Sequence, residues 1–139
     1  MSNSVAEALD HAGLLGPFLA ARFRSRYHDI PPGSGRRTEL LHKLAHRYDE
    51  ILAWKYADPT VGVALEGELR GLGAADQCYC LCVPQELDGR EVPLGKALAA
   101  LYGNGLPVLL VCRPGLLAYF EPEYESGAAK KYILRRPSA

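Results

Sequence analysis

Acidic side chains surround one strongly apolar stretch of the sequence, residues 77–83. Glu68 precedes this stretch, Asp76 opens it and Glu86 follows it, with Lys96 further along the chain. Carboxylates grouped in this way can hold Mg²⁺, which activates a water molecule to attack a phosphodiester. The segment around Glu86 lacks the lysine that nucleases of the restriction-enzyme type usually place two residues after a carboxylate on the same strand. These four residues are candidate catalytic residues of a small metal-dependent nuclease or hydrolase.

Two histidines and an aspartate share one face of a predicted helix. His42, His46 and Asp49 stand at positions i, i+4 and i+7, so that two imidazoles and a carboxylate can reach one metal ion. This face lies opposite the apolar stripe of the helix and points toward water, whereas a catalytic metal needs a partly dry pocket. The His-Glu-x-x-His pattern of zinc proteases is also absent. We interpret the three residues as a solvated polar face, with a metal site as the alternative, and we expect no metal or cofactor.

Three cysteines alternate along the apolar stretch. Cys78, Cys80 and Cys82 project to one face of a strand, about 6.6 Å apart in succession, and Cys112 lies on a second predicted strand. Sulfurs on one straight strand do not converge easily on a tetrahedral zinc ion, which is normally held by Cys-x-x-Cys turns. We interpret the four cysteines as buried free thiols that behave as small apolar residues. Metal binding and redox chemistry are the alternatives.

Charge is unevenly distributed along a chain whose formal net charge is zero. Residues 1–56 carry +2, residues 57–126 carry −6 and residues 127–139 carry +4. Basic segments bind polyanions such as nucleic acid, or they pair with an acidic segment of the same or a second molecule. A dedicated nucleic-acid-binding domain is usually basic overall, which argues against that class. The candidate anion-binding residues are Arg22, Arg26, Arg36, Arg37, Lys130, Lys131, Arg135 and Arg136.

Helices are predicted for the first half of the chain. A capping box opens a helix over 4–12, and a first-turn proline opens a second helix over 17–27. Thr38 is expected to cap a long amphipathic helix over 39–56. Trp54 lies at the margin of the apolar face of this helix, where its side chain either packs under a neighbouring segment or forms part of a partner interface.

Strands and helices are predicted to alternate in the second half. Asp58-Pro59 is typical of an N-cap followed by a first-turn proline, which predicts a helix that runs to Leu72. Apolar runs and turn residues then predict a strand over 77–83, a hairpin arm at 91–92 and a helix over 93–102. Two further strands are predicted over 106–113 and 116–121, joined by a turn at 114–115, and a last strand over 131–135. The last strand is expected at an edge of the sheet, where its charges discourage further pairing.

These elements predict an α+β fold, with α/β as the alternative. We expect N-terminal helices followed by a small mixed sheet of three to four strands with a crossover helix. The length of 139 residues and the hydrophobic content of 48% predict a single domain. Within it we expect a helical subregion over 1–57 and an α/β subregion over 58–139 with a basic C-terminal tail. No apolar run spans a membrane and no signal peptide is evident, so a cytoplasmic protein of bacterial type is expected.

The favoured function is that of a non-enzymatic binding or regulatory protein that acts through protein–protein contacts. The sequence contains no nucleophile elbow and no dinucleotide- or phosphate-binding fingerprint. Its complementary charged segments favour a homodimer or another protein partner, with nucleic acid or another polyanion as an additional partner. The alternative is the metal-dependent nuclease or hydrolase described above, so an enzymatic role stays open.

Overall fold

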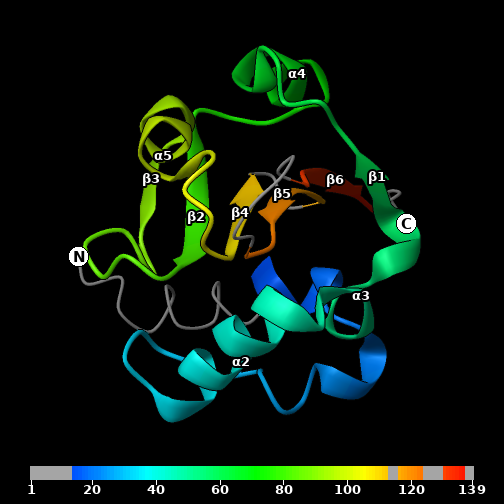
Figure 1. Ribbon diagram of the computed structural model, residues 1–139, viewed down its shortest axis with the longest axis vertical. Helices are drawn as coiled ribbons and strands as arrows, with labels where there is room; N and C mark the ends of the chain where they lie inside the picture. The colour runs from blue at the N-terminus through cyan, green and yellow to red at the C-terminus, as the bar shows by residue number, and fades with distance from the viewer. Residues whose placement is uncertain (1–13, 113–115, 124–129, 137–139) are drawn as a thin grey trace, which may run out of the picture.

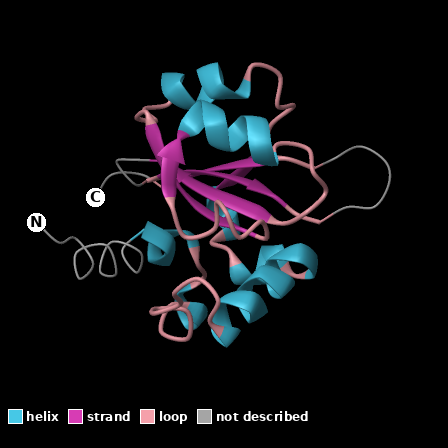
Figure 2. Ribbon diagram, turned by 90° about the vertical axis from the view of Figure 1, so that its left-hand side faces the viewer, coloured by secondary structure: helices cyan, strands magenta, loops and turns pink. Residues whose placement is uncertain are grey.

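The computed structural model describes residues 14–112, 116–123 and 130–136. They form one six-stranded sheet in the order β1-β6-β5-β4-β2-β3, with helices on both of its faces (Figures 1 and 2). The strands are β1 (Ala57–Pro59), β2 (Gln77–Cys82), β3 (Glu91–Pro93), β4 (Val108–Cys112), β5 (Leu117–Glu121) and β6 (Tyr132–Arg135). The helices are α2 (Gly35–His46), α3 (Tyr48–Ile51), α4 (Leu65–Gly71) and α5 (Leu94–Leu101), with short 3₁₀ helices η1 (Gly16–Phe18), η2 (Ala21–Phe23) and η3 (Trp54–Tyr56). Within these residues no helix is long and apolar enough to cross a membrane.

The sheet corrects the predicted fold class, which had three to four strands in a mixed arrangement. Every pair of neighbouring strands is antiparallel. The predicted crossover helix exists as α5, which links β3 to β4, but these two strands flank β2 and do not pair with each other. A helix that crosses over an intervening antiparallel strand creates no parallel pair, which is why the mixed sheet was wrong. β6 lies between β1 and β5, so its predicted place at an edge was also wrong.

The apolar strands and the hairpin arm are present close to their predicted positions. β2 and β4 are buried along almost their whole length because helices cover both faces of the sheet. Tyr79 and Leu81 belong to the core beneath the N-terminal helices, whereas Cys78, Cys80 and Cys82 belong to the core beneath α4 and α5. The predicted common face of these three cysteines is confirmed. The predicted turn at 114–115 lies outside the described residues.

The long helix predicted over 39–56 is divided into three shorter elements. α2 begins earlier than expected, because the Ser34 side chain caps it by accepting a hydrogen bond from the Arg37 amide at 3.3 Å. Thr38, the predicted cap, therefore lies inside the first turn of α2. At Arg47 the backbone leaves the helical region (φ −132°, ψ 35°), which ends α2 and separates it from α3 and η3.

The helix predicted over 17–27 is replaced by η1 and η2 with extended backbone between them. Leu19 forms a β-bridge with Leu52, and the Ala20 amide donates to the Ile51 carbonyl at 2.7 Å. These tertiary hydrogen bonds require extended backbone at Leu19, so they override the local preference for a helix. The helix predicted over 4–12 lies outside the described residues.

The helix predicted from Pro59 to Leu72 begins only at Leu65. Residues 57–59 form β1 instead, an edge strand that pairs with β6 and ends at Pro59. β3, the opposite edge strand, also has three residues and ends in a proline, Pro93. A proline lacks a backbone N–H and is therefore tolerated at an edge. The sequence Asp58-Pro59 suits a helix start equally well, which explains the wrong prediction.

Candidate functional site

The carboxylates predicted to hold Mg²⁺ lie in separate parts of the fold. Glu68 is exposed on α4, and Asp76 forms a 2.6 Å ion pair with Arg70 before β2 begins. Glu86 follows the other end of β2, and the strand alone spans about 20 Å. Lys96 is exposed on α5. Among the described residues no group of three or more His, Cys, Asp or Glu side chains could hold a metal ion.

The two histidines are neighbours, but the aspartate is on a different helix. The rings of His42 and His46 meet edge to face with their centres 5.3 Å apart. The break at Arg47 places Asp49 in α3, which removes the continuous helical spacing on which the three-residue site depended. His46 Nε2 instead lies 3.5 Å from a carboxylate oxygen of Glu123. All three predicted residues are exposed, as expected for a solvated polar face.

The four cysteines are buried and free, which confirms the interpretation as unpaired thiols in the core. Cys78 and Cys112 stand opposite each other on β2 and β4. Burial raises the pKa of Cys82 and of Cys112 to about 12. Hydrogen bonding with Cys78, together with burial, raises the pKa of Cys80 still further. Thiols in this state are protonated at neutral pH and are therefore weak nucleophiles and metal ligands.

Arg37, one of the predicted anion-binding residues, is a buried structural residue. Its side chain is 1% exposed, and its Nε and Nη2 donate to the two carboxylate oxygens of Asp88 at 2.8 and 2.7 Å. Its Nη1 donates to the Ile30 carbonyl at 2.7 Å, and Asp88 also accepts from the Cys82 amide at 3.0 Å. The pair joins α2 to the turn between β2 and β3, so this cation is not available to a ligand.

Arg26 and Arg36 also have partners within the chain. Glu39 accepts two hydrogen bonds from Arg26, at 2.6 and 2.7 Å, and a third from the Tyr27 hydroxyl at 2.5 Å. These bonds lower the pKa of Glu39 to about 2. Arg36 Nη1 donates to the Arg26 carbonyl at 3.3 Å.

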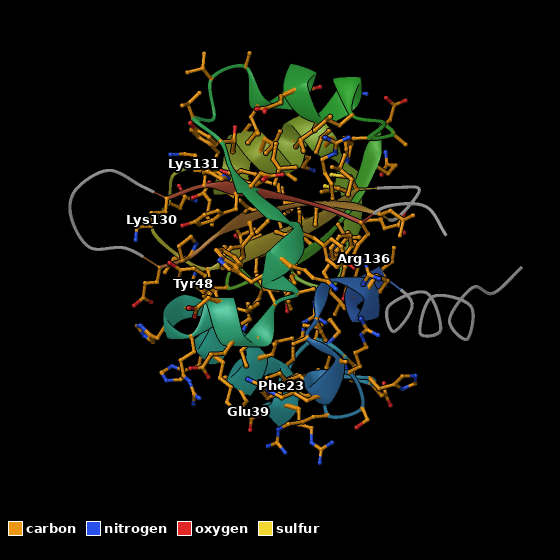
Figure 3. All side chains as sticks on the ribbon, turned by 90° about the vertical axis from the view of Figure 1, so that its right-hand side faces the viewer. Phe23, Glu39, Tyr48, Lys130, Lys131 and Arg136 are labelled. Carbon is orange, nitrogen blue, oxygen red and sulfur yellow. The ribbon has the colours of Figure 1, made fainter. Side chains whose placement is uncertain are left out.

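The C-terminal basic residues do not form one patch. β6 runs between them, and Figure 3 shows Lys130 and Lys131 on one side of the molecule and Arg136 on the other. The ammonium nitrogen of Lys131 lies 5.1 Å from the centre of the Tyr102 ring, and Arg135 is exposed at the end of the strand. The predicted basic tail is therefore divided between two surfaces.

Arg22 and Arg136, from opposite ends of the sequence, come together at one hollow. Both line a space of about 580 Å³ bordered by η2, α3 and η3. Arg24 belongs to the same basic stretch of the sequence as Arg22, and Lys55, which the sequence does not join to either basic segment, was missed; both line the same hollow. We call this space the basic hollow.

Trp54 packs inside an aromatic cluster of its own chain, which confirms the predicted packing under a neighbouring segment. Its ring centre lies 4.6 Å from that of Tyr132, 5.0 Å from that of Tyr48 and 6.5 Å from that of Phe120. The side chain is only partly buried, and it also borders the basic hollow.

Val61 and Val63 project from the loop between β1 and α4. They are 83% and 77% exposed, more than any other large hydrophobic residue of the described chain. Gly62 between them has a φ of +78°, and a Cβ there would come within 2.7 Å of the Tyr102 hydroxyl. Ala64 has a φ of +54°, and it is the one non-glycine residue of the described chain with positive φ. Such backbone costs about 1–3 kcal/mol and persists where the surrounding structure imposes it. We call Val61 and Val63 the apolar tip.

A shallow groove lies beside the apolar tip, between α4 and α5. It has a volume of about 420 Å³, and small or apolar residues make up most of its lining: Gly62, Ala64, Leu65, Gly67, Gly95, Leu98, Ala99 and Tyr102, with Glu66 as its charged member. Gly62 and Ala64 line the groove, and the valines of the tip alternate with them along the chain. The tip and the groove, which we call the α4–α5 face, are therefore one continuous surface beside α4 and α5, the two helices in the upper part of Figure 1.

A further hollow of about 380 Å³ lies between α2 and the turn that follows β2. Leu41, Val83 and Leu106 give it apolar walls, whereas His42 and Glu123 lie among its polar lining. Val83 and Leu106 are 45% and 39% exposed, much less than the valines of the tip.

Comparison with known proteins gives no relative from which a function could be transferred. No protein-family model matches the chain, and neither the curated proteins nor the solved structures contain a significant match.

Proposed function

We propose that this chain is a binding protein that acts through protein–protein contacts, and that the α4–α5 face is its contact surface. The observation that carries the proposal is the exposure of the apolar tip, with Val61 at 83% and Val63 at 77%. Burying a valine side chain contributes about 1.5–3 kcal/mol, so two valines in water on a fixed backbone favour a surface that a partner covers.

The partner that this surface fits is a second copy of the chain. A projecting apolar pair lies directly beside a concave groove lined by small residues. A two-fold arrangement can therefore place the tip of each copy in the groove of the other, so that the same contact forms twice. Small residues such as Gly67 and Ala99 leave room for an inserted valine. The functional unit that we propose is a homodimer.

The distribution of charge supports a protein partner more than a nucleic acid. Nucleic-acid binding depends on a patch or stripe of cations along the phosphate backbone. In the described chain Arg37 is buried, Arg26 is paired with Glu39, and the C-terminal cations are divided between two sides of the molecule. No observation of the described residues brings Glu68, Asp76 and Glu86 to one site, so none supports the nuclease alternative.

Sedimentation equilibrium of the purified chain over about a hundredfold range of concentration tests this function. We expect a reversible dimer, and we expect the double variant Val61→Asp, Val63→Asp to be monomeric, because desolvating the carboxylates opposes insertion into the groove. Both positions are largely exposed, so the variant should keep the melting temperature of the parent monomer.

Val83→Asp is the matched control, because it adds a carboxylate at an exposed valine outside the α4–α5 face. It should dimerise as the parent does. A parent that is monomeric at every concentration contradicts the homodimer. A double variant that dimerises with the parent's affinity contradicts the assignment of the surface.

A further inference from the structure

The basic hollow gathers cations and aromatic rings from three separate segments. Arg22 and Arg24 come from the η2 segment, Lys55 with the rings of Trp54 and Tyr56 comes from η3, and Arg136 follows β6. The space of about 580 Å³ is within the range of small-molecule sites, about 300–1,000 Å³. Neither the α4–α5 face nor the proposed dimer uses any of these residues.

The cations of the basic hollow have no acidic partner within the described residues, a property that they share with Arg36, Arg90 and Arg135 but that here belongs to four cations lining one space. Arg26, Arg37, Arg47 and Arg70 each form an ion pair. Within the described residues no ion pair involves any of the four cations that line the hollow: Arg22, Arg24, Lys55 and Arg136. Like charges held together without a counter-charge repel each other, and a bound anion relieves that repulsion.

Arg136 is held in place by the chain, yet its hydrogen bonding is incomplete. Its Nη1 donates to the Pro17 carbonyl at 2.6 Å, and its guanidinium carbon lies 4.4 Å from the centre of the Tyr56 ring. Its Nε is buried and has no hydrogen-bond partner among the described residues. Lys55 Nζ lies 5.1 Å from the centre of the same ring. Two cations therefore lie against one aromatic ring, and one of them retains an unused donor.

Two carboxylates also line the hollow, and they do not neutralise it. Glu50 is held by Arg47 at 2.6 Å. Asp49 is exposed on α3 and is the single further acidic residue among the lining residues, against four cations. The lining therefore keeps an excess of positive charge on the side formed by η2, η3 and Arg136.

We infer that the basic hollow binds a small organic phosphate. Guanidinium groups match the oxygen geometry of phosphate, and Arg22 and Arg24 are exposed at the hollow, with Arg24 Nε donating to the Leu19 carbonyl at 3.3 Å and the guanidinium carbon of Arg22 4.9 Å from the centre of the Phe23 ring. Trp54 and Tyr56 supply aromatic surface for the organic part of the ligand. The cations line one open hollow of about 580 Å³ and do not extend along a stripe, which favours a small molecule over an extended polyanion.

The test is a titration of the whole chain with three probes: adenosine diphosphate, inorganic pyrophosphate and adenosine. Calorimetry measures all three, and Trp54 is the chain's one tryptophan, so its fluorescence reports pyrophosphate binding at this site. We expect saturable binding of adenosine diphosphate, roughly tenfold tighter than pyrophosphate and than adenosine, or about 1.4 kcal/mol. Added salt should weaken binding of both phosphates.

Arg22→Gln, Lys55→Gln is the diagnostic double variant, because these two side chains form no hydrogen bond within the described chain. It should lose roughly tenfold or more in affinity for adenosine diphosphate. Arg90→Gln, Lys96→Gln is the matched control, with the same change of net charge at exposed positions elsewhere, and it should bind as the parent does.

Three results would overturn the inference. One is the absence of saturation by any phosphate up to about 5 mM. Another is unchanged affinity in the Arg22→Gln, Lys55→Gln variant. The third is equal affinity for pyrophosphate and adenosine diphosphate, which would mean that the organic part of the ligand contributes nothing to binding. None of these results bears on dimerisation, so the two proposals can fail separately.

Discussion

The two layers that cover the sheet both pack on it through an apolar core, but they differ in their buried ion pairs. The N-terminal layer, residues 14–56, adds directional polar contacts to its apolar core, of which the buried Arg37–Asp88 pair and the hydrogen bond from Arg136 to Pro17 are the clearest. The layer formed by α4 and α5 packs on the sheet through leucines, alanines and the thiol groups of β2 and β4, and the Gly103 amide after α5 donates to the buried Glu121 carboxylate of β5 at 3.0 and 3.1 Å. Its ion pairs, from Arg70 to Glu66 and Asp76, are at the surface.

The difference follows from how each layer is connected. α4 joins β1 to β2 and α5 joins β3 to β4, so each helix is tethered at both ends to the same sheet. Within the described chain the N-terminal layer joins the sheet only where η3 runs into β1. A layer connected to the sheet at one end loses more conformational entropy when it packs on the sheet than a helix connected at both ends. Directional hydrogen bonds then fix the position of the layer on the sheet, which its single chain connection does not determine.

Removing the buried cation should have the largest effect on this comparison. Arg37→Met leaves the largely buried Asp88 carboxylate without its guanidinium, and we expect a loss of about 3–5 kcal/mol in the free energy of unfolding. Urea denaturation measures it. Replacing both partners, as in Arg37→Met, Asp88→Leu, should restore part of the loss. A single variant as stable as the parent would contradict the anchoring role of the pair.

A polar group placed in the core beneath α5, in the layer formed by α4 and α5, should lower the free energy of unfolding by a smaller amount. Cys112→Ser puts a hydroxyl into a fully buried site among apolar side chains, and we expect a loss of about 1–3 kcal/mol. Cys112→Ala removes the sulfur without adding a polar group, and it should cost less than the serine variant. The same urea experiment distinguishes the two, and equal losses would mean that packing alone determines the cost.

Alkaline pH should weaken the thiol-rich core by a smaller amount. The pKa of Cys82 and of Cys112 rises from 9.0 to about 12 on folding, because burial disfavours the thiolate. The stabilisation is complete below the unfolded pKa and is lost as the pH rises toward the folded pKa. At about pH 10 each thiol should have lost about 1 kcal/mol. Cys112→Ala should show a weaker dependence on pH between about 8 and 10 in thermal melts, and an unchanged dependence would contradict the assignment.

The smallest effect is expected at the surface of the N-terminal layer. Hydrogen bonds from Arg26 and Tyr27 lower the pKa of Glu39 from 4.5 to about 2. The stability that this carboxylate contributes is present above 4.5 and is lost as the pH falls through about 2. Glu39→Gln should therefore lower the urea midpoint slightly at neutral pH, and the difference from the parent should shrink on acidification. A constant difference at every pH would exclude ionisation as its cause.

The sequence predicts the centre of the sheet well because the signal there is local. The apolar runs that become β2 and β4 need burial on both faces, and no other element of this chain would satisfy that need. β1 and the extended backbone at Leu19 could not be predicted in the same way. Each forms through hydrogen bonds to a distant segment, β6 in one case and residues 51–53 in the other.

The candidate sites show the same limit. The basic side chains could be counted, but only the fold shows that Arg37 is buried against Asp88 and that Arg22 and Arg136 share a hollow. The apolar tip was missed for a different reason. Val61 stands at helical spacing from Leu65 and Leu69, so the sequence places it on the buried face of a helix that in fact begins only at Leu65.

The proline-ended edge strands β1 and β3 limit how another chain could pair with the sheet. Each offers only three residues of backbone, a short template for another strand that would extend the sheet. The contact surface proposed above consists of side chains instead. Specificity can then change by single substitutions at a surface such as the apolar tip while the backbone framework stays constant. The same closed edges also oppose fibrillar stacking of the sheet, so an exposed apolar contact surface can be kept with less risk of aggregation.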